Sequence, residues 1–598
     1  MSKFLFLFLF PLICNSQVRE LDEIVFSTEK VDKKISNTTN SLKVITKEQI
    51  ENSGAISLED ALLKIGGNVI TRTGSFGSVS SLRIRGMQGG FSKVLIDGIE
   101  MNDPTDVNNS FQVNQLDLNN IERIEILKGP QNIIYGTSSI GGVINIVTKR
   151  RKQKEGSLVA SVGSKNTQSV DVSYGGKEHD VFYDLSTSYF KTDGISAFNK
   201  ERTLSAEEDS FERLNLGVKL EKDLSENSKV SYRGIFLNSD LDIDKTTSDV
   251  RFNDLSSYNQ KVHNISYERK FFDNYLNTKF ILKQSDLKRF TANPSFTIEG
   301  NEKKVSLIND FVLLDQHIVL LGAEYMRRES VDSYNYPREF WSESTDVYST
   351  LNLNFNNLIL DLGGRVITGP SYENEFIWKV GSSIEWPFKI VTKLNVGTGF
   401  NAPTLTQLTT GTPVNKNIEA STIKNYDFIV KKTFSDYLFL QLDFFVNNIQ
   451  NQIIWNGSNY SNIGSSQVKG IESQAELSLM KNLNLNFSYS YIESVDKVSK
   501  IDLPKTPSNS ARASIDYSIN SDLSSNISWT YVGDRLDATP GAYPVTYLRM
   551  PSYQLLDLGL KYKNIGLKIE NILDREYEET RNYGTRGRSF YINYKIKL

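Results

Sequence analysis

The chain has 598 residues, enough for several ordinary domains or for one very large β structure beside a smaller domain. Its formal net charge is −3, so no overall basic character points to nucleic acid as a partner. Tyrosine (28 residues) and phenylalanine (32 residues) are plentiful although the mean hydropathy is below zero, which is unusual for a helical membrane protein and suits a barrel with half-apolar strands.

Residues 1–16, MSKFLFLFLFPLICNS, combine Lys3 with an apolar run that ends at Ile13. This order is typical of a secretory signal peptide, with cleavage expected after Ser16, and the run is too short to span a bilayer. Lipid attachment at Cys14 is the alternative, but bulky Ile13 stands where a lipoprotein signal needs a small residue. Because Cys14 is the only cysteine, the mature chain is expected to form no disulfide or zinc–thiolate cluster.

Residues 17–40 form a polar leader that contains one short β-prone segment, LDEIVFST at 21–28. The rest of the leader lacks periodicity and is expected to be flexible. A strand in a flexible leader can add to the sheet of another protein. The alternative is an ordinary first strand of the next domain.

Residues 41–149 carry the mixed helix and strand signals of a compact α+β domain. Thr46 and Gln49 have the spacing of a capping box, and residues 57–60 open a second helix in the same way. Strands expected at 68–71, 82–85 and 94–96 are separated by glycine-rich loops. Residues 121–149 follow as strand, Gly/Pro turn and strand. Roughly 110 residues can bury a core of their own.

Residues 150–598 show hardly a helix, and alternation of apolar and polar residues dominates. The last segment is the clearest, because Phe590, Ile592, Tyr594 and Ile596 alternate with polar neighbours. A soluble sandwich would need a second sheet to cover every apolar face. At about 20 residues for each strand with its connection, this length predicts about 22 antiparallel strands, a size at which barrels hold a plugged lumen. The expected fold is a 22-stranded transmembrane β-barrel with the α+β domain as its plug.

Several segments resemble motifs of the TonB-dependent outer-membrane receptors, in family order along the chain. Residues 21–28 are similar to the TonB box. The plug motifs are resembled by LRIRG at 82–86, VLIDG at 94–98, IERIEILKGP at 121–130 and YGTSSIGGVINIVT at 135–148. The barrel motifs are resembled by GFNAPTL at 399–405, VKGIE at 468–472 and NILDREY at 571–577. Two departures are Arg586, where the family usually has proline, and Leu598, where the family ends on an aromatic residue.

The resemblance implies TonB-dependent uptake of a scarce ligand across the bacterial outer membrane by a monomeric, multi-pass barrel. Its expected partners are TonB, outer-membrane lipid and a small-molecule ligand; no enzyme activity, nucleic acid or required cofactor is expected. Within the family, the compact size of the chain and its plug sequence at residues 94–103 look most like those of the cobalamin receptors. The alternative is a ferric siderophore receptor. A passive porin and a secreted adhesin or enzyme are the rivals outside the family.

The resemblance also assigns residues to roles. The TonB-binding residues would be Asp22, Glu23, Ile24, Val25, Phe26, Ser27 and Thr28. The residues expected to lock the plug against the barrel are Arg83, Arg85, Glu122 and Glu125, with a solvated surface strand as the alternative. The ligand is expected to contact Ser75, Phe76, Gln88, Phe91, Asn102 and Asp103, although structural turns would use the same residue types.

An acidic stretch in the barrel suggests a metal ion. Asp240, Asp242 and Asp244 alternate near a predicted strand end and therefore share a face. Carboxylate oxygens suit Ca²⁺, and cobalamin receptors use calcium in such barrel loops. The stretch is no EF-hand, because Lys245 stands where that loop needs glycine. We expect a calcium site here, with a solvated acidic loop as the alternative.

Overall fold

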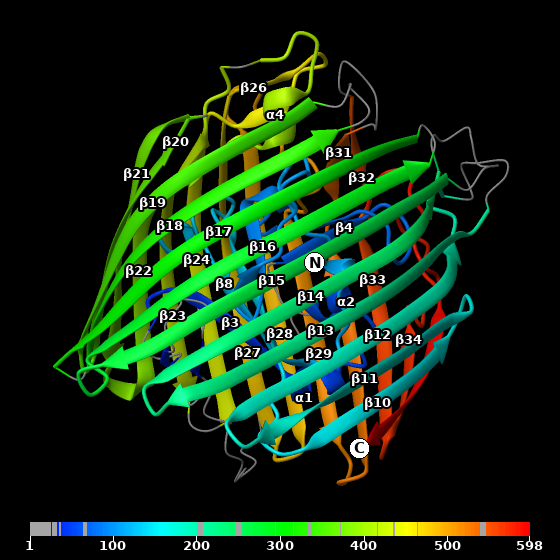
Figure 1. Cartoon of the computed structure of the whole chain (residues 1–598). Helices are drawn as coiled ribbons and strands as arrows, with labels where there is room; N and C mark the ends of the chain where they lie inside the picture. The colour runs from blue at the N-terminus through cyan, green and yellow to red at the C-terminus, as the bar shows by residue number, and fades with distance from the viewer. Residues whose placement is uncertain are drawn as a thin grey trace.

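The computed structural model describes residues 25–26, 33–34, 38–63, 68–199, 207–244, 254–292, 295–314, 316–332, 338–370, 372–415, 417–434, 437–462, 464–538 and 546–598. Its main element is a closed barrel of antiparallel strands, strongly tilted in Figure 1. The wall closes where the last strand, β35 (Ser589–Lys597), pairs with the first, β10 (Glu155–Gly163). The sheet order contains 22 strands, which confirms the predicted fold class.

Each strand pairs with the barrel strand that follows it in the chain. Between β10 and β35 run β11 (Thr167–Glu178), β12 (Val181–Ile195), β13 (Asp209–Ser225), β14 (Ser228–Ile243), β15 (Asp254–Phe271), β16 (Leu276–Ala292), β17 (Ser295–Leu313), β18 (His317–Asp332), β19 (Arg338–Phe355), β20 (Leu358–Gly369), β21 (Tyr372–Trp386), β22 (Ile390–Asn401), β23 (Ser421–Phe434), β24 (Leu438–Gln450), β27 (Ser465–Met480), β28 (Leu483–Asp496), β29 (Asn509–Ser518), β30 (Leu523–Val532), β33 (Tyr553–Tyr562) and β34 (Ile565–Glu570). Closure pairs the backbone polar groups within the wall, as a lipid environment requires.

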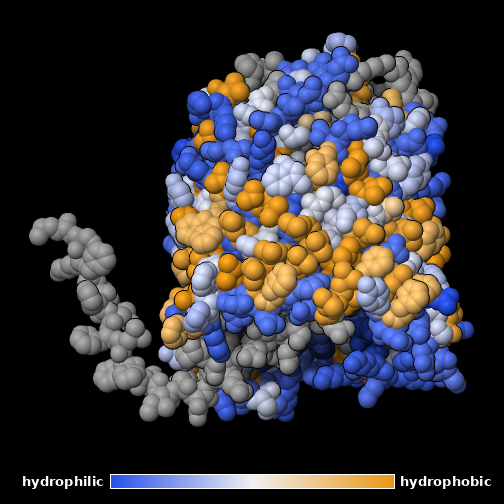
Figure 2. All heavy atoms as spheres, turned by 90° about the vertical axis from the view of Figure 1, so that its left-hand side faces the viewer, coloured by the Kyte–Doolittle hydropathy of each residue, from blue (hydrophilic) through white to orange (hydrophobic). Residues whose placement is uncertain are grey.

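The alternation along the strands decides which side chains face lipid. In β35, Phe590, Ile592 and Tyr594 are exposed, whereas Ser589 and Tyr591 are buried. On the face shown in Figure 2, apolar side chains gather over the middle of the wall, with polar side chains above and below. This band is the surface that a bilayer covers. Among the described helices, none has both the length and the apolar character needed to cross a membrane.

The two ends of the barrel differ in the length of their connections. At the short-turn end, residues 179–180, 226–227 and 481–482 join neighbouring strands, and the chain also ends there, at Leu598. At the long-connection end, residues 402–420 and 571–588 are typical. The small elements of the connections are α4 (Leu405–Thr409), β25 (Ile453–Trp455), β26 (Tyr460–Asn462), β31 (Arg535–Ala538), β32 (Tyr547–Met550) and the short 3₁₀ turn η6 (Pro387–Lys389).

The α+β domain lies inside the barrel (Figure 1). Its main sheet has the order β3 (Ser41–Thr46), β8 (Ile121–Lys128), β9 (Gly142–Thr148), β6 (Ser92–Ile96) and β7 (Ile99–Glu100), with a parallel pairing of β6 and β9. A second sheet pairs β4 (Asn68–Arg72) with β5 (Ser80–Ile84). The helical elements are α1 (Lys47–Asn52), α2 (Leu58–Leu63), α3 (Asn132–Tyr135), η3 (Gly89–Phe91) and η4 (Val113–Gln115).

Local sequence explains how this plug folds. The Thr46 side chain accepts a hydrogen bond from the Gln49 backbone N–H, and the Gln49 side chain accepts one from the Thr46 backbone N–H, so the expected capping box starts α1. Leu58 and Leu62 on α2 are fully buried, and each such leucine contributes about 1.5–3 kcal/mol. The same apolar cluster includes Val262 of the barrel wall. Plug and barrel therefore share one core.

The segments at the predicted domain limits lie as follows. In the leader, β1 (Val25–Phe26) pairs antiparallel with β2 (Lys33–Lys34). At the other limit, the last plug strand ends at Thr148 and the first barrel strand begins at Glu155, on either side of the expected boundary after Lys149. The signal-peptide region lies outside the described residues.

Candidate functional site

The segment expected to bind TonB lies mostly outside the described residues. Of residues 22–28, the structure describes Val25 and Phe26, which form β1. The remaining five, Asp22, Glu23, Ile24, Ser27 and Thr28, fall outside it. The role of this segment stays a prediction.

Arg85 is the centre of a buried ion cluster between plug and barrel. Its guanidinium lies 2.9 Å from Asp427, 3.1 Å from Glu472 and 3.6 Å from Asp443. It also stacks on the ring of Phe445, 4.5 Å from the ring centroid. The Arg85 side chain has no exposed surface, and its three carboxylate partners come from β23, β24 and β27. One plug residue thus joins three strands of the wall.

Two more plug residues complete this cluster. Lys128 on β8 lies 3.0 Å from Glu472, and the Ser41 hydroxyl donates to Asp443 over 2.5 Å. Desolvated charges are costly unless each finds partners, so the site depends on keeping its cations and carboxylates together. The cluster can hold the plug in one orientation within the barrel.

The other three residues of the expected lock are placed differently. Glu125 is fully buried inside the plug, where Arg123 lies 2.8 Å away and the Asn145 amide donates to it over 2.9 Å. Arg83 is half-buried and interacts electrostatically with Asp537 of β31. Glu122 is exposed on β8. The structure therefore brings Arg85 to barrel carboxylates, whereas the described partners of Glu125 lie in the plug.

Sequence reasoning missed a second plug–barrel cluster, where β7 meets β17 and β18. Lys93 lies 3.1 Å from Glu100, which lies 3.4 Å from Arg328 of the barrel. Arg328 also pairs with Glu302 at 2.7 Å, and Glu302 pairs with Lys283 at 2.6 Å. Charges at Lys93 and Glu100 in an apolar stretch were the available signal, but their barrel partners are far away in the sequence.

A third cluster joins α2 and β4 to the last strands of the barrel. Arg72 lies 2.5 Å from Glu579 of the connection 571–588. Lys568 on β34 lies 2.7 Å from Glu570 and 3.7 Å from Asp60 of α2. All five side chains are mostly buried. The plug is thus held by charges on several sides of the wall.

The loops expected to contact ligand lie at the long-connection end. The Thr406 hydroxyl of α4 donates to the Thr105 carbonyl over 2.9 Å, and the Thr404 hydroxyl donates to the Val107 carbonyl over 3.0 Å. Arg289 of β16 donates to the Thr105 hydroxyl over 2.7 Å. Plug loops and barrel connections therefore form one continuous surface at this end.

Five of the six residues expected to contact ligand turn inward. These buried residues are Ser75, Phe76, Phe91, Asn102 and Asp103, whereas Gln88 is partly exposed. The Phe76 ring packs on Phe190 with centroids 5.1 Å apart. The Asn102 amide oxygen accepts from the Val94 N–H over 3.0 Å, and its amide nitrogen donates to the Asn109 carbonyl over 2.6 Å. In this structure these five side chains shape the loops, and their contact with ligand stays a prediction.

Other side chains project from the same end. Val79, at the base of the loop 73–79 where it accepts a hydrogen bond from the Thr73 N–H, is 61% exposed. On the β25–β26 hairpin, Trp455 and Tyr460 pack edge to face with ring centroids 5.1 Å apart, and Trp455 is 43% exposed. Exposed aromatic rings offer a flat apolar surface with a polar edge. Sequence reasoning missed this pair because aromatic residues occur all along the barrel.

The acidic residues expected to bind calcium lie on or next to β14. Asp240 is exposed beside buried Ser239, so it faces away from the lumen, and it accepts from Ser257 over 2.6 Å. Asp242 accepts from the Ser210 hydroxyl over 2.5 Å. Asp244 follows the strand end. Within the described ranges, no three His, Cys, Asp or Glu side chains are grouped to hold a metal ion. Calcium binding stays a prediction.

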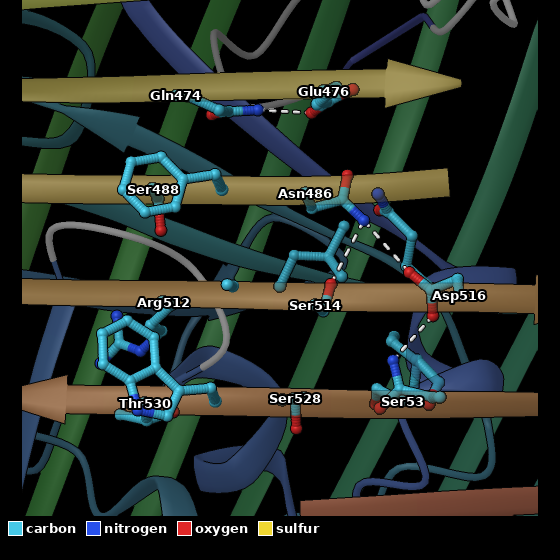
Figure 3. Close-up of a pocket in the computed structure, with 18 of the residues that line it drawn as sticks. Ser53, Gln474, Glu476, Asn486, Ser488, Arg512, Ser514, Asp516, Ser528 and Thr530 are labelled. Atoms are coloured by element: carbon cyan, nitrogen blue, oxygen red, sulfur yellow. Dashed lines mark hydrogen bonds between the residues drawn. The ribbon is translucent and has the colours of Figure 1, made fainter. Parts of the chain in front are cut away.

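Two cavities with both polar and apolar lining lie between the plug and part of the wall. One of about 100 Å³ lies between α1 and strands β27–β30 (Figure 3). In its wall the Asn486 amide donates to Asp516 over 3.1 Å and to Ser514 over 3.3 Å. A second cavity of about 160 Å³ reaches the short-turn end at Lys563 and Asn564. The plug is therefore packed unevenly around its circumference.

Two family models match the sequence and together cover most of the chain. The model described as TonB dependent receptor-like, beta-barrel matches residues 156–572. The model described as TonB-dependent Receptor Plug Domain matches residues 34–143. The matched regions correspond to the barrel and the plug of the structure.

Comparison with individual proteins gives relatives of nearly the same length. A protein named vitamin B12 transporter BtuB from Vibrio cholerae serotype O1 is 24% identical, over 97% of this chain and 96% of its own. Its namesake from Photobacterium profundum is also 24% identical, over 98% of both chains. A mutant of the ferric enterobactin receptor PfeA from Pseudomonas aeruginosa, in complex with enterobactin, has a TM-score of 0.82 at 16% identity, covering 94% of this chain and 100% of its own. The siderophore receptor PirA from Acinetobacter baumannii has a TM-score of 0.81 at 16% identity, covering 93% and 98%.

Proposed function

This chain belongs to the TonB-dependent receptors of the outer membrane, and on that premise we propose that it imports cobalamin by active transport. The outer membrane holds no ATP, so the energy to accumulate a scarce ligand has to come through TonB. In this proposal TonB binds residues 22–28 by strand addition, since main-chain hydrogen bonds give such pairing its affinity. The long-connection end then faces the extracellular medium and receives the ligand.

The observation that best supports active transport is that the plug fills the barrel. Arg85 is fully buried among carboxylates of β23, β24 and β27, and the apolar core of the plug continues into the wall. A bulky ligand can pass only if part of this packing is rearranged. A passive porin needs neither the plug nor an energy source.

The choice of cobalamin is supported by the relatives named as vitamin B12 transporters, which align with this chain over nearly its full length. The second candidate is a ferric siderophore. It is favoured by the structural likeness to proteins described as siderophore and ferric enterobactin receptors. Both ligands are large enough to need the same plug movement, so the fold does not separate them.

Uptake in whole cells tests the proposal. A strain without its own cobalamin and enterobactin receptors is given this gene, and accumulation of labelled cyanocobalamin and of ferric enterobactin is measured with and without TonB. We expect cyanocobalamin to accumulate only when TonB is present. If only ferric enterobactin accumulated, the proposed ligand would change from cobalamin to a ferric siderophore. Uptake that persists without TonB would overturn active transport.

A further inference from the structure

Arg586 links the ligand-facing end of the plug to helix α2. It belongs to the connection 571–588, at a position where the family resemblance leads one to expect proline. Its guanidinium lies 3.8 Å from the centroid of the Phe76 ring, 3.4 Å from Glu570 and 3.7 Å from Asp60. The side chain is only 12% exposed. A long cationic residue has therefore entered the interior where a short, neutral ring was expected.

The three partners of Arg586 belong to three different parts of the protein. Phe76 lies in the plug loop 73–79, in which Val79, hydrogen-bonded to Thr73 at the base of the loop, is exposed. Asp60 is a buried residue of α2. Glu570 ends β34 in the barrel wall. A displacement of the loop 73–79 therefore changes the contact between Phe76 and Arg586, and Arg586 also contacts α2.

The buried charges around Arg586 tie the position of α2 to the position of the guanidinium. Asp60 and Glu570 both contact Lys568 and Arg586, so two buried carboxylates share two cations. Without Arg586, Lys568 and the more distant Arg72, 3.9 Å from Asp60, would have to compensate both carboxylates. An uncompensated buried charge is strongly unfavourable, and the Phe76 ring would also lose the cation on its face. The position of α2 therefore depends on where the Arg586 guanidinium lies.

We propose that Arg586 is a positioning residue that couples ligand binding at the loop 73–79 to the hold of the barrel on α2. The proposal rests on the transport function proposed above. Ligand that presses on the loop moves the Phe76 ring, the guanidinium follows, and its contact with Asp60 changes. In the transport function proposed above, TonB binds the leader of the same plug, so we use the ligand-dependent affinity of the receptor for TonB as the measure of this coupling.

The first test measures the affinity of the purified full chain for a soluble TonB fragment, with and without cyanocobalamin, and in a parallel arm ferric enterobactin. For the wild type we expect the bound probe to raise the TonB affinity about tenfold, within the usual range of such couplings. The quantity compared is the ratio of the TonB affinity with probe to the TonB affinity without probe. In Arg586→Gln this ratio should fall to within about twofold of unity. In Arg586→Lys, which keeps the charge, most of the roughly tenfold difference should return. An unchanged ratio in Arg586→Gln overturns the proposal.

Arg588→Gln is the matched control. Arg588 lies in the same connection, but its side chain is 44% exposed and its ion pair with Asp574 spans 3.8 Å. Its ratio should equal that of the wild type. A merely structural loss would lower the stability of both the ligand-bound and the ligand-free receptor and would leave the ratio in place, so the ratio distinguishes coupling from folding.

A second test needs no ligand. The urea midpoint of plug unfolding is measured for Arg586→Gln, Phe76→Leu and the double variant, since residues in contact give non-additive effects. We expect the urea midpoint of the double variant to be no lower than that of the less stable single variant. If the two single losses of stability simply added in the double variant, the Arg586–Phe76 link would be overturned. If neither probe changes TonB affinity in the wild type, the proposed ligands are wrong, while this cycle still decides the role of Arg586.

Discussion

Replacement of Arg85 by methionine should release the plug from the barrel wall. The variant keeps an apolar stem of similar length but removes the cation from between Asp427, Asp443 and Glu472. Lys128 would still compensate Glu472 through its 3.0 Å contact, but the other two carboxylates would lose their ion pair with the plug arginine. Breaking a buried ion pair on one side costs about 3–5 kcal/mol, because the remaining charge stays desolvated. At about 1.4 kcal/mol for each factor of ten, the undocked plug becomes roughly a hundredfold to a few thousandfold more populated.

Urea unfolding followed by limited proteolysis measures this effect, because the plug is digested once it leaves the lumen while the barrel strands stay protected. We expect the midpoint for plug digestion to fall clearly in Arg85→Met. Arg327→Met is the control, since Arg327 is 42% exposed and its ion pair with Glu329 is a surface pair worth at most about 1 kcal/mol. Equal midpoints for the two variants would refute the view that the Arg85 cluster holds the plug.

Four further outcomes are expected. Val25→Pro removes an N–H from the TonB-binding segment and should abolish uptake of the transported probe while leaving its binding intact; uptake at the wild-type rate would contradict the assignment. Gly86→Ala places a side chain at φ +71° and 2.5 Å from a Thr506 methyl group, so plug stability should fall by about 1 kcal/mol or more in the urea assay. Burial, helped by nearby Lys595, lowers the pKa of Lys149 to about 8. The unfolded chain then binds more protons between about pH 8 and pH 10.5, so stability should rise with pH across that window, and Lys149→Met should remove the rise. If calcium binds at β14, calorimetry should show that it raises probe affinity and that Asp242→Asn abolishes the gain; no calcium effect in the wild type would remove the site.

The sequence was sufficient for the parts of this protein that follow from local chemistry. Alternation with a period of two predicted membrane strands, because neighbouring side chains on a strand face opposite sides. The length of the alternating region predicted the strand number, and the capping residues at Thr46 and Gln49 predicted the start of α1. These inferences hold because strand period, turn chemistry and helix capping act within a few residues.

Residues that act through distant partners were beyond such reasoning. Arg85 was expected at the contact between plug and barrel, but its partner Asp427 lies 342 residues along the chain, on a strand chosen by barrel closure. Phe76 was expected to contact ligand, which stays a prediction, and the structure shows that its ring packs against Arg586, a partner far along the chain. In both cases the residue type was informative, whereas the partner of the side chain could not be read from it.

What the sequence alone determined, then, is the class of structure: a barrel whose strands alternate between lipid and lumen, filled by a separate α+β plug. What only the tertiary structure decided is which charges meet across the interface between them. Asp240 faces outward although it shares its stretch with buried residues, and Glu125 pairs inside the plug while Arg85 reaches the wall. The physical reason is that the strand register around a closed barrel and the orientation of the plug inside it depend on the packing of the whole chain.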